Sequence, residues 1–317
     1  MKRNIWIDTD PGIDDAVAIT AAFAADDRLN ICGISAVAGN QTIDIVTHNA
    51  LWLTELLGRE DVSVVRGADR PLIREAYHAG DIHGAYGLGY VNPGGVSRQL
   101  SSEQGAAYIY QRIMELPQEE KVTMVTIGPL TNIGLLVRAF PDAAQKIDQI
   151  VCMGGSTVEG NITATAEYNI WADPEAAEMV FQSGIPIVMC GLDVTMKCIL
   201  RKDDIDTLEK GDDIQKLLSK MLTFYFDSPA YKGMEAVAMH DSVPVLYLLC
   251  PDIFSGEAHA MRVSCTEDMC RGMTVIYDGA YTYANRGLPK NVFVVRDVDG
   301  SAFRRELMKL LMNVRRP

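Results

Sequence analysis

Four aspartates lie within eight residues of one another, in the sequence Asp-Thr-Asp-Pro-Gly-Ile-Asp-Asp at positions 8–15. An apolar run at 4–7 precedes them and an alanine-rich run at 16–25 follows, which predicts a strand, a tight turn and a helix with Asp14 and Asp15 in its first turn. Neighbouring carboxylates raise one another's pKa unless they share a proton or a cation. Oxygen ligands with no His or Cys nearby favour Ca²⁺ or Mg²⁺ over zinc. The stretch therefore predicts a site for a hard divalent cation, and the alternative is a helix N-terminus with surplus acidic residues.

Composition and charge limit the class of protein. A chain of 317 residues is long enough for one large α/β domain or two smaller ones. A formal net charge of −13 argues against nucleic acid or an anionic membrane as partner, so a small neutral substrate is expected. Charges interrupt every apolar stretch well before 18 residues, and the N-terminus runs directly into the first predicted strand. We therefore expect a cytoplasmic protein without a signal peptide.

The cysteines indicate a reducing compartment. There are seven, an odd number, and none forms a C-x-x-C pair. Most lie in apolar runs, namely Cys32, Cys152, Cys190 and Cys250. We expect reduced core residues and no cysteine nucleophile.

Apolar runs alternate with helical patterns along the chain. Strands are predicted at 29–37, 62–65, 121–127, 149–153 and 185–190, and helices at 43–57, 104–114, 130–140, 204–226, 242–250 and 301–312. Strands near 273–277 and 291–295 are expected to complete the far side of the sheet. This order predicts a single α/β domain over 1–317, with a mostly parallel, Rossmann-like sheet and helices on both faces. Ligands of such sheets bind at the C-terminal ends of the strands, where Asp10 and Asn40 fall.

One long segment lacks a regular pattern. Residues 72–100 are rich in Gly, His and Tyr and include the run His83-Gly84-Ala85-Tyr86. Loops of this length inside a domain are usually functional or disordered. The segment is therefore a candidate active-site lid, and the alternative is a surface excursion without a role.

Two further polar clusters are candidates for chemistry. Asn161, Glu167 and Asn169 lie on an irregular segment and offer donors and acceptors suited to sugar hydroxyls. Asp173, followed by Pro174, is expected to cap a helix instead. His240 and Asp241 precede an apolar helix and follow an aromatic segment at 224–232. A histidine at a helix start is often only a structural hydrogen-bonding group, but this neighbourhood makes His240 a catalytic candidate as well.

The stretch at 8–16 closely resembles the signature of the inosine-uridine-preferring nucleoside hydrolases. The resemblance continues, in order, at 37–40, 83–84, 126–132, 153–155, 161–174 and 240–241. Members of this family cleave the N-glycosidic bond of ribonucleosides with water and hold one Ca²⁺ in a single α/β domain. The resemblance therefore implies a ribonucleoside hydrolase with a nucleoside hydrolase fold.

The resemblance also implies roles at the metal. Asp10, Asp15 and Asp241 are expected to bind Ca²⁺ through their side chains, and Thr126 through its carbonyl oxygen. Asp10 is further expected to act as general base on a metal-bound water. The transition state is expected to resemble an oxocarbenium ion, which carboxylates around the ribose ring stabilise.

The implied substrate contacts surround the ribose and the base. His240 matches the histidine that members with uridine activity place near the leaving group, so it is the general-acid candidate. The other expected contacts are Asp14 and Asn169 at the ribose hydroxyls, Asn40 beside the water and the ring, Asn161 and Glu167 toward the 5′ end, and either Tyr231 or Tyr225 at the base. His83, in the candidate lid, is also expected to bind the substrate. Pyrimidine ribonucleosides are favoured as substrates, with inosine as a further candidate. A homo-oligomer, either dimer or tetramer, is also implied.

The acidic stretch is also compatible with two other classes of protein. An apolar strand followed by Asp-x-Asp resembles haloacid-dehalogenase-type phosphatases, which use an Asp nucleophile with Mg²⁺. Those proteins normally carry Gly-Thr or a similar pair after the second Asp, whereas Pro11 and Gly12 stand here. A non-catalytic Ca²⁺-dependent sugar-binding protein is the second alternative, and it would need neither His240 nor a base.

Overall fold

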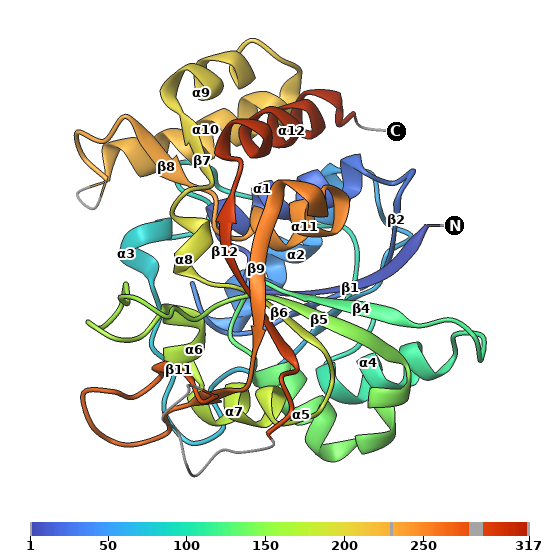
Figure 1. Ribbon diagram of the computed structural model, residues 1–317. Helices are drawn as coiled ribbons and strands as arrows, with labels where there is room; N and C mark the ends of the chain where they lie inside the picture. The colour runs from blue at the N-terminus through green and yellow to red at the C-terminus, as the bar shows by residue number, and fades with distance from the viewer. Residues whose placement is uncertain (1, 229–230, 279–287, 316–317) are drawn as a thin grey trace.

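Eight strands form one central sheet in the order β3-β2-β1-β4-β5-β6-β12-β9 (Figure 1). The computed structural model describes residues 2–228, 231–278 and 288–315. In sheet order the strands are β3 (Val64–Arg66), β2 (Leu29–Ala36), β1 (Arg3–Thr9), β4 (Val122–Thr126), β5 (Ile147–Met153), β6 (Ile187–Cys190), β12 (Val292–Val298) and β9 (Phe254–His259). Neighbouring strands are parallel except β12 and β9, which run antiparallel. The predicted mostly parallel α/β fold is confirmed.

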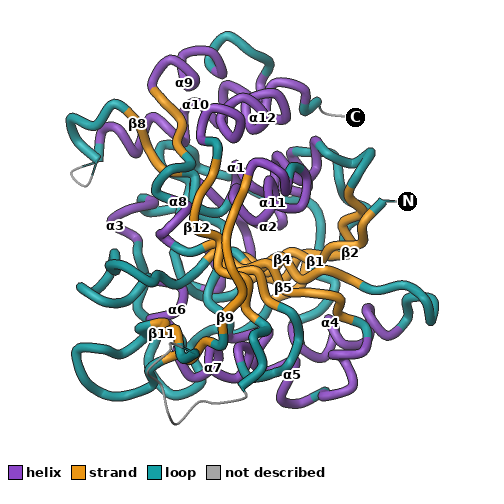
Figure 2. Tube along the Cα trace, viewed as in Figure 1, coloured by secondary structure: helices purple, strands orange, loops and turns teal. Residues whose placement is uncertain are grey.

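Helices cover both faces of the sheet, which explains why its central strands are apolar throughout (Figure 2). On β1, Ile5 and Ile7 belong to one buried cluster and Trp6 to another, because successive side chains point to opposite faces. The first face carries α1 (Ile13–Ala24), α2 (Ile43–Leu56) and α11 (Ser242–Leu249), with α10 (Asp213–Asp227) and α12 (Gly300–Asn313) packed on α1. The second face carries α4 (Gly105–Met114), α5 (Thr131–Ala139) and α7 (Pro174–Phe181).

Two predicted elements differ from the structure. The helix predicted over 204–226 is two helices, α9 (Lys202–Leu208) and α10, because the chain turns at Gly211 and Gln215 caps the start of α10 by accepting from the Asp212 N–H. The strand predicted near 273–277, β11 (Thr274–Ile276), does not join the main sheet. It pairs with β10 (Met261–Val263), and β7 (Ile199–Arg201) pairs with β8 (Ala236–Ala238) in another small sheet. The far side of the main sheet is completed by β12 and the antiparallel β9.

The register of the parallel strands brings their C-terminal ends to one edge. Thr9 is level with Ala36, and Met153 is level with Cys190. Thr126 is paired with Asp8 on one side and with Cys152 on the other. Short helices α3 (Gly80–His83), α6 (Tyr168–Ala172) and α8 (Leu192–Thr195) lie beyond this edge (Figure 1). Two 3₁₀ turns lie in connections, η1 (Pro141–Gln145) between α5 and β5 and η2 (Pro251–Ile253) between α11 and β9.

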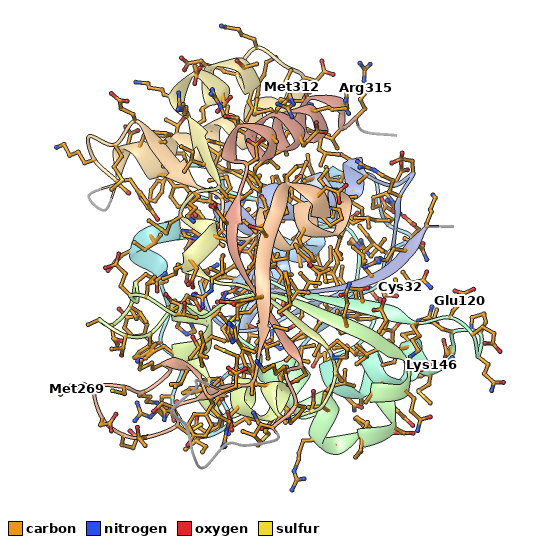
Figure 3. The ribbon with its side chains drawn as sticks, in the orientation of Figure 1. Cys32, Glu120, Lys146, Met269, Met312 and Arg315 are labelled. Atoms are coloured by element: carbon orange, nitrogen blue, oxygen red, sulfur yellow. The ribbon has the colours of Figure 1, made fainter. Side chains whose placement is uncertain are left out.

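All seven cysteines are free, as expected. Cys152 and Cys190 are buried in the core, whereas Cys250 is half-buried. Cys32 is also half-buried and lies toward the outer margin of the molecule, near Glu120 (Figure 3). In the ranges that the structure describes, no helix is both long enough and apolar enough to cross a membrane.

Candidate active site

The turn between β1 and α1 is held together by the carboxylate of Asp15. Its Oδ1 accepts a hydrogen bond from the Thr9 hydroxyl at 2.6 Å, and its Oδ2 accepts from the Gly12 N–H at 2.9 Å. Asn40, which follows β2, donates from Nδ2 to the same Oδ2 at 3.0 Å. A Cβ at Gly12 would lie 2.5 Å from His83 Nδ1, so a larger residue does not fit there. The predicted strand, tight turn and helix with Asp14 and Asp15 in its first turn are confirmed.

Asp10 is fully buried and keeps one carboxylate oxygen without a partner. Its Oδ2 accepts from the Asn40 N–H at 2.7 Å, but its Oδ1 has no hydrogen-bond partner among the described residues. A Cβ at Gly39 would lie 2.1 Å from Oδ2, and a Cβ at Gly128 would lie 2.6 Å from Oδ1. The two glycines therefore make room for this carboxylate. A buried, unpaired carboxylate oxygen is costly unless a cation, a proton or a water satisfies it.

Three carboxylates lie close together beside the turn between β1 and α1. Asp14, Asp15 and Asp241 each offer an oxygen, and these atoms lie within 4.8 Å of one another. Burial and the charge of Asp14 raise the pKa of Asp15 to about 6. Burial also raises the pKa of Asp10, with a further contribution from Asp15, and that of Asp241, with a further contribution from Asp14. No Lys or Arg in the described ranges forms a salt bridge with any of these carboxylates. Their oxygen-only donor set fits a hard metal cation.

The structure brings the expected metal ligands to one place but groups them differently. The cluster of mutually close oxygens contains Asp14 rather than Asp10. Asp14 is already engaged, because its Oδ1 accepts from the Tyr225 hydroxyl at 2.8 Å. Thr126 is the last residue of β4 and is fully buried. The individual roles at the metal stay predictions.

A cavity of about 460 Å³ opens above this acidic cluster. The expected site residues on its wall are Asp14, Asn40, His83, Asn161, Glu167, Asn169, Tyr231, His240 and Asp241. The other three, Asp10, Asp15 and Thr126, are fully buried and do not form part of the wall. The cavity thus joins polar residues from strand ends, the 72–100 segment and α10.

Asn169 presents an acceptor to the cavity. Its Nδ2 donates to the carbonyl oxygens of Ile127 and Met153, each at 3.1 Å. Its Oδ1 has no protein partner in the described part of the chain. Asn161 is arranged in the opposite sense, because its Oδ1 accepts from the Tyr168 N–H at 2.9 Å and its Nδ2 is left as a donor.

Glu167 is a helix N-cap, which the sequence did not indicate. Its carboxylate accepts backbone N–H groups from Gly155 and Asn169 at 2.9 Å and from Ile170 at 3.2 Å. Burial raises the pKa of Glu167 to about 7, although these three donors oppose that shift. Its side chain therefore shapes the cavity wall by holding α6. The predicted cap at Asp173 is confirmed, because its Oδ1 accepts from the Ala176 N–H at 3.1 Å.

Three histidines line the cavity, and two of them, His83 and His240, are buried, which lowers their pKa values below the ordinary value. His83 Nδ1 accepts from the Ile13 N–H at 3.1 Å, which leaves the ring proton of neutral His83 on Nε2. His240 Nδ1 lies 2.8 Å from Thr195 Oγ1. Neutral imidazoles at these positions are suited to donating a hydrogen bond to a leaving group.

Tyr225 and Tyr231 both line the cavity, with ring centroids 5.2 Å apart. The Tyr225 hydroxyl is bound to Asp14, whereas no partner is seen for the Tyr231 hydroxyl among the described residues. Tyr86, by contrast, is 48% exposed and is not on the wall.

Sequence reasoning missed several wall residues in the 72–100 segment. Tyr77, His78, Ala79, Asp81 and Ile82 also line the cavity. Tyr168 anchors this segment, because its hydroxyl lies 2.8 Å from the carbonyl oxygens of both Gly39 and Tyr77. The Gly, His and Tyr content indicated the segment as a whole, but no signal distinguished these residues individually. That the segment acts as a lid stays a prediction.

Comparison with known proteins identifies a family and a fold that this chain shares. Residues 5–305 match the family described as inosine-uridine preferring nucleoside hydrolase. The chain is 38% identical to a pyrimidine-specific ribonucleoside hydrolase RihA of Photobacterium profundum, over 99% of this chain and 100% of that protein. It is also 38% identical to a non-specific ribonucleoside hydrolase RihC of Escherichia fergusonii, over 98% and 99%. Among solved structures, a plant nucleoside hydrolase, PpNRh1, has a TM-score of 0.92 at 31% identity, covering 98% of this chain and 99% of that one.

The fold and the acidic cavity, together with these matches, define a glycosidase of the N-glycosyl class. The chain belongs to the inosine-uridine preferring nucleoside hydrolase family. It is a ribonucleoside hydrolase, which cleaves the N-glycosidic bond between ribose and base with water. The family match leaves no support for a haloacid-dehalogenase-type phosphatase or a non-catalytic sugar-binding protein.

Proposed function

We propose that this ribonucleoside hydrolase prefers pyrimidine ribonucleosides, uridine and cytidine, and accepts inosine as a secondary substrate. The proposal is carried by the position of His240 on the wall of the same cavity as Asp14 and Asp241. A donor at that wall helps a base that leaves poorly by itself. The names of the two relatives at 38% identity, one pyrimidine-specific and one non-specific, support the same range of substrates.

The cation is assigned as Ca²⁺, held by Asp10, Asp15, Asp241 and the Thr126 carbonyl oxygen. The unpartnered Oδ1 of Asp10 and the raised pKa values of the acids support this assignment. Ca²⁺ takes six to eight oxygen ligands, so these residues do not exhaust its coordination. When bound, the cation keeps the acids ionised and lowers the pKa of a coordinated water.

Each side chain of the site has a separate role in the proposed reaction. Asp10 Oδ1 accepts a proton from the attacking water, whose oxygen forms the new bond to the ribose C1′. Asp14 and Asn169 Oδ1 accept hydrogen bonds from the ribose hydroxyls and hold the ring. The bond between C1′ and the base nitrogen breaks with its electron pair going to the base, and the surrounding carboxylates stabilise the positive charge left on the sugar. His240 donates a hydrogen bond or proton to the departing base.

A substrate panel tests this function directly. Uridine, cytidine, inosine, adenosine and their deoxy forms are assayed with Ca²⁺, after chelation, and after Ca²⁺ is restored. We expect uridine and cytidine to react fastest and chelation to abolish turnover reversibly. Deoxyuridine is expected to react at least about a hundredfold more slowly than uridine, because a missing 2′-hydroxyl leaves buried polar groups of the site unpaired. Comparable rates for the two would remove the argument from the ribose diol.

The stabilisation of the fold by Ca²⁺ is expected to grow from pH 5 to pH 7.5. The pKa of Asp15 is raised from 3.8 to about 6, and those of Asp10 and Asp241 are raised as well. Between 3.8 and these raised values, the metal-free fold binds more protons than the unfolded chain, so its free energy of unfolding falls as the pH rises. A cation replaces those protons and binds better as they leave. Thermal unfolding at pH 5 and at pH 7.5, each with chelator and with a fixed excess of Ca²⁺, measures the stabilisation by Ca²⁺. A stabilisation that is equal at the two pH values, or larger at pH 5, contradicts the assignment of these acids to a metal site.

We further propose that the enzyme acts in the cytoplasm on free nucleosides, without a nucleic-acid or membrane partner, as a homo-oligomeric dimer or tetramer. The strongly acidic composition supports the absence of an anionic partner. Light scattering coupled to size-exclusion chromatography measures the number of subunits.

A further inference from the structure

A buried hydroxyl stands behind the histidine at the leaving-group side of the cavity. Thr195 ends α8, the short helix that follows β6, and is fully buried. Its Oγ1 lies 2.8 Å from His240 Nδ1. Among the residues that the structure describes, this is the only hydrogen-bond partner of the Thr195 hydroxyl. Nδ1 is thereby occupied, so Nε2 is the ring nitrogen that is left for the cavity.

The direction of this hydrogen bond follows from the burial of the hydroxyl. If His240 Nδ1 carried the proton and donated it, the Thr195 hydroxyl proton would be buried without an acceptor. A buried donor without an acceptor is unfavourable, because its hydrogen bond to water is lost and not replaced. If the hydroxyl donates to Nδ1 instead, its proton is satisfied, and the proton of the neutral imidazole is on Nε2. The second arrangement leaves no buried hydroxyl proton unsatisfied and presents the Nε2 proton to the cavity.

We propose that Thr195 is a positioning residue that sets the tautomer of His240 and places its ring proton on Nε2, facing the substrate cavity. The inference rests on the proposed function for the reaction step that it serves. In the opposite tautomer, Nε2 would present a lone pair to the departing base and would have no proton to donate. Thr195 thus decides whether His240 meets the leaving group as a donor or as an acceptor.

Thr195 is itself held in place from two sides. The Leu192 N–H at the start of α8 donates to the Gly155 carbonyl oxygen at 2.9 Å. Asp193 accepts from the Thr157 N–H at 2.9 Å and from Arg296 Nη1 on β12, also at 2.9 Å. The helix is therefore fixed both to the loop after β5 and to β12. A hydroxyl fixed in this way orients the ring as well as choosing its tautomer.

The two buried histidines of the cavity, His83 and His240, reach the same tautomer by different means. His83 Nδ1 accepts from a backbone N–H, that of Ile13, which every substitution at Ile13 other than proline leaves in place. His240 Nδ1 depends on a side-chain hydroxyl, which a single substitution removes. Thr195→Val is the matched test because valine keeps the shape of threonine and lacks the hydroxyl, and Thr195→Ser is the control that keeps it.

Nitrogen-15 NMR of the calcium-loaded protein labelled at histidine gives a readout independent of activity. The chain has five histidines, and the signals of His240 are identified by their loss in His240→Gln. We expect a protonated, pyrrole-type Nε2 and an unprotonated, pyridine-type Nδ1 in the wild type and in Thr195→Ser. We expect the two tautomers to mix in Thr195→Val. A proton on Nδ1 in the wild type overturns the inference, and this measurement stands even if Thr195→Val fails to fold.

Kinetics of the same variants show whether the tautomer matters for the reaction. Thr195→Val is expected to lower kcat/KM for uridine by about tenfold or more, while p-nitrophenyl riboside, whose leaving group needs no proton, changes less than about threefold. Thr195→Ser is expected to retain both rates. An unchanged uridine rate in a folded Thr195→Val overturns the inference. If the NMR result is as expected but no form of the enzyme hydrolyses a nucleoside, the proposed function fails and the tautomer assignment stands.

Discussion

Replacing Asp10 by Asn is expected to lower kcat/KM for uridine by at least about a thousandfold, which is within the range expected for loss of a general base. The substitution removes the negative charge while keeping the shape of a side chain that Gly39 and Gly128 enclose. The amide oxygen still accepts from the Asn40 N–H, but the unpartnered Oδ1 becomes a group that neither accepts a proton nor binds a cation well. Steady-state hydrolysis of uridine at saturating Ca²⁺ measures the effect.

The control for this variant is Asp69→Asn, at an exposed acid outside the cavity wall. It lowers the net negative charge by the same amount and is expected to keep full activity. Thermal unfolding without Ca²⁺ shows that Asp10→Asn is folded, and the stabilisation by Ca²⁺ is expected to shrink in that variant alone. More than a tenth of the wild-type rate in folded Asp10→Asn would count against the proposed mechanism.

The second large effect is expected from His240→Gln. Loss of the donor at the leaving group should lower kcat for uridine by about a hundredfold or more. Hydrolysis of p-nitrophenyl riboside should change only a few-fold, because its leaving group departs without a proton. Asp14 and Asp241, which hold the sugar and the cation in the proposed mechanism, are unchanged, so KM for both substrates should move little.

The two substrates serve as controls for each other in this experiment. A general loss of structure or of metal would lower both rates together, whereas loss of leaving-group assistance lowers only one. Equal losses on uridine and on p-nitrophenyl riboside would therefore rule out this role for His240. Calcium-dependent thermal stabilisation equal to that of the wild type shows that the neighbouring Asp241 still participates in the metal site.

The sequence predicted the edge of the sheet at which the acidic cluster and the cavity lie. Apolar strands followed directly by Asp10 and Asn40 sufficed for this, because a parallel sheet aligns its strand ends. Asp241 could be joined to this group only through the family resemblance. It is 226 residues from Asp15 along the chain, and no periodicity reports a contact over such a separation.

Other features could not be read from residue type. Glu167 was expected among the substrate contacts, but its carboxylate also completes the N-terminus of α6. The sequence did not indicate this cap, because glutamate is not a typical N-cap residue and no proline follows it, as Pro174 follows Asp173. Thr195 gave no signal either, since its role depends on the rotation of one hydroxyl toward a ring that lies 45 residues away. The antiparallel β9 and the separate pairing of β10 with β11 depend on how the loops between them run, which strand propensity does not specify.

The hydrogen bond from the Tyr225 hydroxyl to Asp14 connects a residue on the cavity wall with the carboxylate proposed to bind the ribose. Tyr225 comes from α10 and lines the cavity, whereas Asp14 comes from α1 and is the carboxylate proposed to hold the sugar. A substitution at Tyr225 that is meant to redirect nucleobase preference also takes a donor away from the sugar-holding group. Under the proposed roles, nucleobase selectivity and ribose affinity are therefore coupled at this position, and a redesign for a new nucleobase has to restore the lost donor from another side chain.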